Sequence, residues 1–262
     1  MIVGSIKEDL ALEKRVSLTP ESAKNIIGLG LKICIEKDYA THLGISDSEY
    51  KTIGVEIKNS SKEILNLSSA IIRVNCPSEN EINNLKENTI LIGMFNPTKN
   101  KNLVEKIISK NINTFSLELL PRITRAQSMD VLSSQSNLAG YRAVVDCVSE
   151  FEKAVPMMMT AAGTVPAAKV LVIGAGVAGL QAIATAKRLG AIVSATDVRA
   201  ASKEQVESLG GKFLTVEQSE DMETAGGYAK ETSEDYKKKQ AEMMKEALKK
   251  NDIVICTALI PG

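Results

Sequence analysis

Apolar and polar residues alternate in blocks along the first half of the chain, where short apolar runs are separated by amphipathic stretches. The short runs have the length and composition of buried strands. Because parallel strands are joined by crossover helices and are buried on both faces, this alternation predicts a mostly parallel sheet with helices on both sides. The expected strands are Ile2–Ile6, Leu31–Ile35, Ala70–Val74, Thr89–Met94 and Thr114–Leu117.

Helix start signals stand between these runs. Thr19 followed by Pro20 predicts an N-cap with a proline at the first helical position. Ser46 with Glu49 three residues later predicts a capping box. The segment 100–110 has the spacing of an amphipathic helix. The apolar side chains of this helix are expected to face inward: Leu103, Val104, Ile107 and Ile108.

The pattern changes in the middle of the chain. The segment 122–136 is polar and predicts a loop, whereas the apolar spacing over 138–156 predicts a long helix that joins two domains. The run Met157–Met159 that follows is interpreted as packing at the domain junction. The expected domains are residues 1–137 and 138–262.

A glycine-rich turn follows the buried-strand pattern at 169–173. It reads G-x-G-x-x-G and is followed by a helical segment, a second strand pattern and Asp197. This order of strand, glycines, helix, strand and acid is typical of a dinucleotide-binding site. Gly174 permits the tight turn, Gly176 lets the backbone approach a pyrophosphate at the helix N-terminus, and Gly179 allows close helix-to-strand packing.

The residue after the second strand indicates which dinucleotide binds. Asp197 stands where a carboxylate would accept hydrogen bonds from the adenosine ribose hydroxyls and would repel a 2′-phosphate. The sequence therefore favours NAD(H) over NADP(H). Arg199 leaves the alternative open, because an arginine at this place can pair with that phosphate.

Composition excludes several other classes of function. Lys and Arg number 32 and Asp and Glu also number 32, so no net charge attracts a nucleic acid or an anionic membrane. Aromatic residues make up only 3% of the chain, which leaves few platforms for stacking bases. The one histidine and the four widely spaced cysteines lack the close pairs of a zinc site. We expect no metal and no nucleic acid.

The N-terminal residues do not have the pattern of a secretory signal. Charged side chains at Lys7, Glu8 and Asp9 come too early for an apolar core. The longest uncharged apolar stretch, 170–186, is short for a membrane span and contains the glycine motif. We therefore expect a cytoplasmic protein that does not itself insert into a membrane.

Groups that could act beside a nicotinamide ring are few. Dehydrogenases commonly need a His or Lys as proton donor or acceptor, and His42, in a turn of the first domain, is expected to be structural. The segment 122–130 instead offers a guanidinium, an amide and a carboxylate on a loop. Hydride transfer between two nicotinamides moves no proton and suits such a site. An ordinary hydrophilic interdomain loop remains the alternative on pattern alone.

Several motifs occur together over essentially the whole chain: Glu13–Pro20, Pro121–Asp130, Gln135–Arg142, Gly174–Gly179, Asp197–Arg199, Gly226–Ala229 and Ala258–Gly262. Together they resemble the NAD(H)-binding domain I of the proton-translocating NAD(P) transhydrogenase alpha subunit, in the alanine dehydrogenase/transhydrogenase family. The resemblance implies an α/β fold with two Rossmann-like, doubly wound parallel-sheet domains joined by a long helix. The second domain is expected to be incomplete at its C-terminus, because relatives continue past Gly262.

The resemblance also implies roles for individual residues. Arg122, Gln127 and Asp130 would hold and orient the nicotinamide end and so act as the catalytic groups. The remaining cofactor contacts fall into four sets. They are Ile123 and Thr124 beside the nicotinamide; Gly174, Gly176, Val177, Ala178 and Gly179 at the pyrophosphate; Asp197, Val198 and Arg199 at the adenosine; and Gly227, Tyr228, Gln240 and Leu259 as further contacts, the first two in a mobile loop.

The implied reaction passes hydride from NADH on this chain to NADP⁺ on a separate NADP(H)-binding domain. In the family a transmembrane domain couples this step to proton translocation, and two copies of domain I form a homodimer. The expected location is therefore the cytoplasmic face of the inner membrane, reached through partner subunits.

Two alternatives remain. An alanine dehydrogenase would carry a lysine and a histidine in the stretches that here read Arg73–Pro77 and Gly93–Pro97, and both residues are missing. A truncated NAD-binding module without activity of its own is the non-enzymatic alternative, and the ending at Gly262 favours it.

Overall fold

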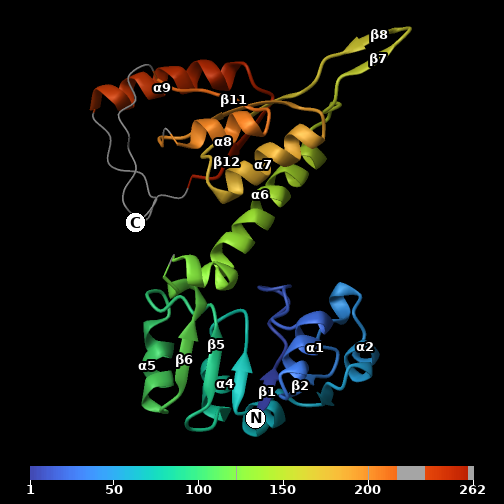
Figure 1. Ribbon diagram of the computed structural model, residues 1–262, viewed down its shortest axis with the longest axis vertical. Coiled ribbons are helices and arrows are strands. Elements are labelled where there is room, and N and C mark those ends of the chain that lie inside the picture. Colours follow the sequence, from blue (N-terminus) through green and yellow to red (C-terminus); the bar gives the residue numbers. More distant parts are fainter. Residues whose placement is uncertain (122, 200, 217–233, 259–262) are drawn as a thin grey trace. The chain divides into compact units, whose positions relative to one another are not determined.

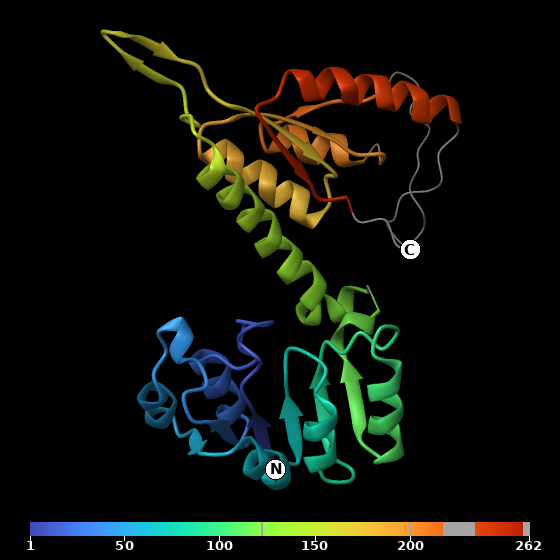
Figure 2. The same ribbon diagram turned by 180° about the vertical axis from the view of Figure 1, so that it is seen from behind.

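The computed structural model describes residues 1–121, 123–199, 201–216 and 234–258, and for residues 234–237 it describes the backbone alone. The chain forms two compact units, Met1–Asp130 and Val131–Gly262 (Figures 1 and 2). Each unit contains its own parallel sheet and its own hydrophobic core. The expected α/β architecture with parallel sheets is confirmed.

The first unit is built on a six-stranded sheet with the strand order β3-β2-β1-β4-β5-β6, in which all neighbours pair in parallel. Its strands are β1 (Ile2–Ser5), β2 (Lys32–Glu36), β3 (Glu56–Lys58), β4 (Ala70–Ile72), β5 (Ile90–Gly93) and β6 (Asn113–Ser116). Its helices are α1 (Pro20–Gly28), α2 (Asp47–Thr52), α3 (Ser61–Leu67), α4 (Glu79–Asn84) and α5 (Lys101–Ser109), with 3-10 turns at Thr41–Leu43, Leu117–Leu119 and Thr124–Met129.

The strand order reverses between β1 and β4, so this unit is doubly wound. Right-handed crossovers place α1 and α2 on one face and α3, α4 and α5 on the other. Two separate apolar clusters agree with this arrangement. One contains Tyr50 of α2, and the other contains Ile82 of α4 and Ile107 of α5.

The helix signals read from the sequence are confirmed in this unit. Thr19 caps α1 through its side chain, and Ser46 and Glu49 form the capping box of α2. One inward position was wrong. Ile107 is buried, but Ile108 is 66% exposed, because the next residue along a helix is turned by about 100° and leaves the buried face.

The second unit contains a four-stranded parallel sheet with the order β11-β10-β9-β12. Its strands are β9 (Lys169–Ile173), β10 (Ile192–Thr196), β11 (Lys212–Phe213) and β12 (Ile253–Cys256). Its helices are α6 (Val131–Glu150), α7 (Val177–Arg188), α8 (Ser202–Ser208) and α9 (Glu234–Lys249). Both views show α6 and α7 lying side by side (Figures 1 and 2).

The long helix α6 begins earlier than expected. Residues 131–136 were predicted as the end of a polar loop, but they form its first turns. The segment is polar and serine-rich, yet it contains neither glycine nor proline, so packing can decide its conformation. The loop between the 3-10 turn at Thr124–Met129 and α6 is therefore reduced to Asp130.

A two-stranded antiparallel hairpin, β7 (Met158–Thr160) and β8 (Gly163–Val165), precedes β9 and extends away from the rest of the second unit (Figures 1 and 2). The interpretation of Met157–Met159 as junction packing is wrong, because all three side chains are at least half exposed. A hairpin standing away from the sheet has no core to cover it.

Candidate functional site

The glycine turn lies at the carboxyl end of β9, beside the point where the strand order reverses towards β12. Gly174 has a φ of 94°, in the left-handed region that favours glycine, and its N–H donates to the Thr196 carbonyl at 2.8 Å. A Cβ on Gly179 would lie 1.8 Å from the carbonyl oxygen of Gly174. Both glycines are therefore required by the backbone, as the motif predicted.

Helix α7 starts from this turn with an open N-terminus. Gly176 is its N-cap residue and has no side chain to bind the first N–H groups. Val177 at the first helical position is 43% exposed. The N–H groups of a first helical turn, together with the helix dipole, form a site that suits a phosphate. The geometry therefore fits the pyrophosphate role expected for Gly176, Val177 and Ala178.

Helix α6 supports the turn from behind. A Cβ on Gly140 would lie 2.0 Å from the carbonyl oxygen of Ala178, so the two helix backbones touch at this point. Asn137 also donates to the side-chain oxygen of Gln181 at 3.2 Å. The long helix thus fixes the first turn of α7, which carries the proposed phosphate contacts.

Asp197 follows β10 and points back to the glycine turn. Its Oδ2 accepts the N–H of Ala175 at 2.7 Å, and its Oδ1 accepts the N–H of Arg199 at 2.9 Å. The Arg199 guanidinium completes a two-point ion pair, with Nε on Oδ1 at 2.9 Å and a terminal nitrogen on Oδ2 at 3.0 Å. Burial raises the pKa of Asp197, but these bonds from Arg199 and Ala175 outweigh it, so the pKa is lowered on balance.

Thr257 is a site residue that the motif did not reveal. It comes directly after β12, and its hydroxyl lies 2.9 Å from the Gly174 carbonyl and 3.2 Å from the Ile173 carbonyl. Its own N–H donates to the Ile173 carbonyl at 2.8 Å. Thr257 therefore fastens the end of β12 to the glycine turn. Only the position of this hydroxyl at the end of a strand could have drawn attention to it.

The loop expected to hold the nicotinamide belongs to the first unit, whereas the glycine turn belongs to the second. Ala126 anchors the loop in the first unit as its buried residue, and Ile123, Thr124 and Gln127 are exposed. Asp130 is half-buried, and its N–H donates to the Gln127 carbonyl at 3.3 Å. The loop thus presents its polar side chains outward from a fixed backbone.

Several expected contacts lie outside the described residues: Arg122, Gly227, Tyr228 and Leu259. Gln240 is described and is half-buried on α9, in the same unit as the glycine turn. Val198 is half-buried beside Asp197. Of the residues expected at the adenosine, Asp197 and Arg199 are thus the two whose polar contacts the structure defines in detail.

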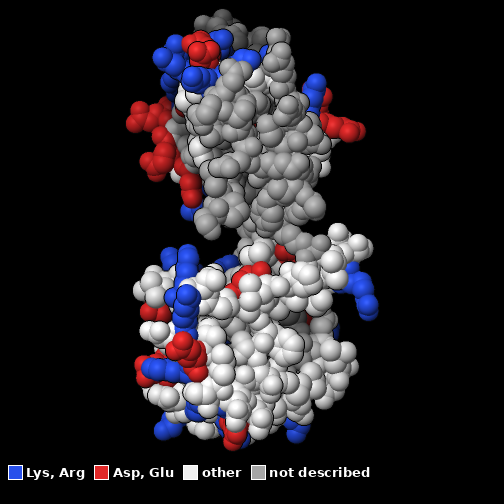
Figure 3. Space-filling view, turned by 90° about the vertical axis from the view of Figure 1, so that its left-hand side faces the viewer, with Lys and Arg blue, Asp and Glu red and all other residues white. Residues whose placement is uncertain are grey.

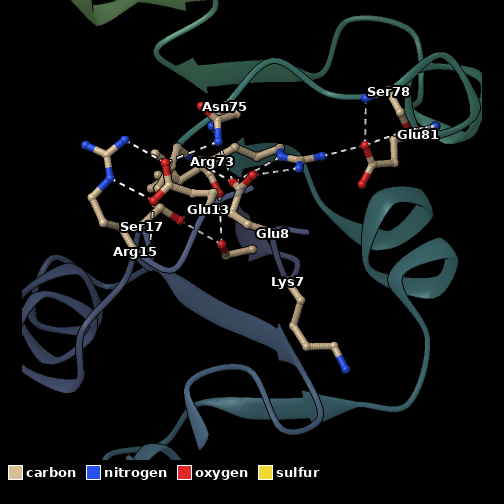
Figure 4. A network of polar contacts seen from close by, with 12 residues as sticks. Lys7, Glu8, Glu13, Arg15, Ser17, Arg73, Asn75, Ser78 and Glu81 are labelled. Atoms are coloured by element: carbon tan, nitrogen blue, oxygen red, sulfur yellow. Dashed lines mark hydrogen bonds and ion pairs between the residues drawn. The ribbon is translucent and has the colours of Figure 1, made fainter. Parts of the chain in front are cut away.

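The strand ends of the first unit are filled by a network of the chain's own charges (Figure 4). Arg73, after β4, pairs with Glu8, after β1, at 3.0 Å and with Glu81 at 2.7 Å, and the Arg73 and Glu8 side chains are only 5% and 6% exposed. Glu8 also accepts the Val74 N–H at 2.9 Å. The point where this sheet reverses its strand order is thus occupied by internal ion pairs rather than left open to a ligand.

The residues that replace the alanine dehydrogenase pair belong to the same region. The Asn75 side chain donates to Glu13 at 3.3 Å, and the Asn96 N–H donates to Glu118 at 2.5 Å. Glu13 in turn pairs with Arg15 at 2.6 Å. His42 is exposed and its Nε2 bonds the Lys14 carbonyl at 2.7 Å, a structural contact in a surface turn.

The surface agrees with the balanced charge of the sequence. On the face of the first unit in Figure 3, acidic and basic side chains are interspersed and wide areas are uncharged. Within the described ranges, no helix has the length and apolar character needed to cross a membrane. Those same ranges hold no group of three His, Cys, Asp or Glu side chains that could bind a metal ion.

Comparison with known proteins places the chain in a family. Residues 4–139 match the family described as alanine dehydrogenase/PNT, N-terminal domain, and residues 143–262 match its C-terminal domain. The chain is 51% identical to the first of the parts into which NAD(P) transhydrogenase subunit alpha is divided in Rhodospirillum rubrum, over the whole chain and 70% of that protein. It is 42% identical to NAD(P) transhydrogenase subunit alpha of Haemophilus influenzae, over the whole chain and 51% of the relative.

A solved structure agrees with these matches. The crystal structure of transhydrogenase from Sinorhizobium meliloti superimposes with a TM-score of 0.87 and 45% identity, over the whole chain and 70% of that structure. The Rossmann-like fold of the two units is thereby shown, and the strands, glycine turn and terminal acid that suggested it from sequence are present. The chain belongs to the alanine dehydrogenase/NAD(P) transhydrogenase family, and it resembles the alpha subunit of the transhydrogenase branch.

Proposed function

We propose that this chain is the NAD(H)-binding component of a proton-translocating transhydrogenase. The observation that carries the proposal is the constellation at the end of β9: a glycine turn, an open helix N-terminus and a buried carboxylate at Asp197. Each part suits one portion of a dinucleotide. The similarity to transhydrogenase alpha subunits supports this interpretation of the site.

NADH would bind with its pyrophosphate on the first turn of α7 and its adenosine ribose at Asp197. Arg122, Gln127 and Asp130 of the first unit would orient the nicotinamide, with Ile123 and Thr124 beside them. The further contacts proposed are Val198, Arg199, Gly227, Tyr228, Gln240 and Leu259. Asp197 favours NAD(H) over NADP(H), because a buried carboxylate repels a 2′-phosphate.

The groups of this chain would act by positioning. When bound, the dihydronicotinamide supplies a hydride, and NADP⁺ on a separate domain receives it. Such a transfer leaves no proton to be moved, so an amide and a guanidinium that fix the ring can suffice. The strand ends of the first unit support this interpretation, because Arg73 and Glu8 are committed to each other and leave no acid-base pair there.

The same interpretation implies partners. An NADP(H)-binding domain would receive the hydride, and a transmembrane domain would couple transfer to proton translocation, which would hold this chain at the cytoplasmic face of the inner membrane. We also propose a homodimer. The exposed methionines of the β7–β8 hairpin support it, because an apolar hairpin in water gains stability when a second copy covers it.

Equilibrium binding tests the nucleotide assignment. NADH fluorescence is expected to report a lower Kd than NADPH, and the chain mixed with L-alanine and NAD⁺ is expected to produce no NADH. Tighter NADPH binding would overturn the assignment, and alanine oxidation would return the chain to the dehydrogenase branch.

The loop is tested separately by Gln127→Asn, which shortens an exposed amide without changing its chemistry. Hydride transfer to an NADP analogue on the partner domain should fall while circular dichroism and NADH binding are retained. Ser128→Ala, on the neighbouring exposed position, serves as the control. Equal rates for Gln127→Asn and the control would remove Gln127 from the site. NADH binding without any turnover would favour a binding module.

A further inference from the structure

The Asp197 carboxylate has four hydrogen-bonding contacts from its own chain. Two come from the backbone N–H groups of Ala175 and Arg199, and two come from the Arg199 guanidinium. A carboxylate offers about four acceptor positions, so little capacity is left for a ribose diol. If the adenosine ribose binds at Asp197, as the proposed function requires, the Arg199 side chain must give up its place.

The two backbone contacts would remain when this happens. They hold the carboxylate beside the glycine turn independently of the guanidinium, because they come from the main chain at positions 175 and 199. The Arg199 side chain is 23% exposed, whereas that of Asp197 is 8% exposed. The guanidinium therefore lies on the solvent side of the carboxylate, as a cover that can swing away.

The Arg199 side chain also lies beside the phosphate-binding turn. A Cβ built on Gly176 would find one of its terminal nitrogens 3.8 Å away and no nearer neighbour. A guanidinium at this place has the reach and the fork geometry to bind a 2′-phosphate. In the free chain its charge is instead neutralised by a two-point pair with Asp197.

We propose that Arg199 determines specificity at the adenosine 2′ position and is held inactive by Asp197. Asp197 thus has two functions, which are to accept the ribose hydroxyls of NAD(H) and to keep Arg199 away from a 2′-phosphate. This proposal rests on the proposed nucleotide site and goes further, because it makes selectivity a property of the pair rather than of the carboxylate alone.

The proposal predicts that the two residues are coupled. Asp197→Asn keeps the size and the acceptor oxygen of the side chain but removes the charge that holds Arg199. NADPH affinity should then rise at least about tenfold, a gain typical of a new charged hydrogen bond. In Asp197→Asn/Arg199→Ala this gain should be lost, whereas Arg199→Ala alone should change NADPH affinity little.

The test is a titration of NADH and NADPH into the wild type, both single variants and the double variant, at low and high salt. Arg188→Ala, at the far end of α7, is the charge-matched control. Circular dichroism checks that each variant is folded, and Asp197→Ser replaces Asp197→Asn if that variant is not. The NADPH gain should shrink at high salt.

The outcomes distinguish failure of this proposal from failure of the proposed function. If the wild type binds neither nucleotide, the proposed function fails and this proposal fails with it. If the wild type binds NADH but Arg199→Ala changes NADPH affinity equally with Asp197 and with Asn at position 197, the site stands and the proposal is overturned. An equal effect of Arg188→Ala would also overturn it, because the gain would then reflect net charge.

Discussion

Single side chains hold the nucleotide turn in shape. Thr257 joins β12 to the turn through its hydroxyl, and Asp197 joins β10 to it through the Ala175 N–H. These bonds fix the backbone before any ligand arrives, which lowers the ordering cost of binding. The position of Asp197 was predictable because it follows a strand at the spacing of the motif. The bonds of Thr257 were not, because they join residues 83 positions apart.

Thr257→Val tests this fastening, because valine keeps the shape of threonine and removes the hydroxyl. The Gly174 carbonyl would lose a hydrogen bond worth about 1 kcal/mol, and the NADH Kd should rise up to about fivefold. Fluorescence titration and urea unfolding measure the two effects. Thr257→Ser keeps the hydroxyl and should behave like the wild type; a serine variant as weak as the valine variant would contradict the role given to the hydroxyl.

At the scale of elements, the contact between α6 and α7 positions the site. Gly140 allows the backbone of α6 to touch the carbonyl of Ala178 in the first turn of α7. The sequence predicted a helix in this region, but it did not reveal that residues 131–136 belong to it or that Gly140 is the contact. A helix pattern identifies an apolar face, whereas a close backbone approach depends on which helix lies opposite.

Gly140→Ala should force the two helices apart. Overpacking of this kind typically costs about 1 to 3 kcal/mol, so stability should fall by about 2 kcal/mol and NADH binding should weaken with it. Gly28→Ala is the matched control. Gly28 is an exposed helical residue whose added Cβ meets nothing within 4 Å, so stability should stay the same or rise by up to about 1 kcal/mol. Equal behaviour of the two variants in urea unfolding would contradict the contact.

For the whole molecule, periodicity and strand-end signals predicted both parallel sheets and the dinucleotide turn. They did not predict the ion network of the first unit, because Glu8 and Arg73 are far apart in sequence and meet only when β1 and β4 pair. The exposure of Met157–Met159 was missed for a related reason. Apolar residues normally indicate a core, and only the fold shows that this run lies on a projecting hairpin.

The carboxylates of both units make stability depend on pH in one direction. The hydrogen bond from Arg15 lowers the pKa of Glu13 from 4.5 to about 2. Burial raises the pKa of Glu81, but attraction to Arg73 and hydrogen bonds with Ser78 lower it on balance, and the pKa of Asp197 is lowered as well. Because the unfolded chain then binds protons first, stability is full above about pH 5 and is lost as the pH falls towards 2.

Urea unfolding at pH 7, 5 and 3 measures this loss. Glu13→Gln should flatten the acid limb, because glutamine does not titrate. Glu105→Gln, in which an exposed carboxylate of α5 is replaced, should leave the limb unchanged. A wild type whose stability stayed constant down to pH 3 would contradict the assignment of these carboxylates.

Isotope tracing of the hydride tests the central claim most directly. NADH carrying deuterium at the transferred position is mixed with this chain, the NADP(H)-binding domain and an NADP⁺ analogue, and the product is examined by mass spectrometry. If this chain holds NADH for direct transfer to the second nicotinamide, the deuterium should appear in the reduced analogue and none should reach water. Deuterium in the solvent, or no transfer while NADH is bound, would contradict direct transfer from this chain.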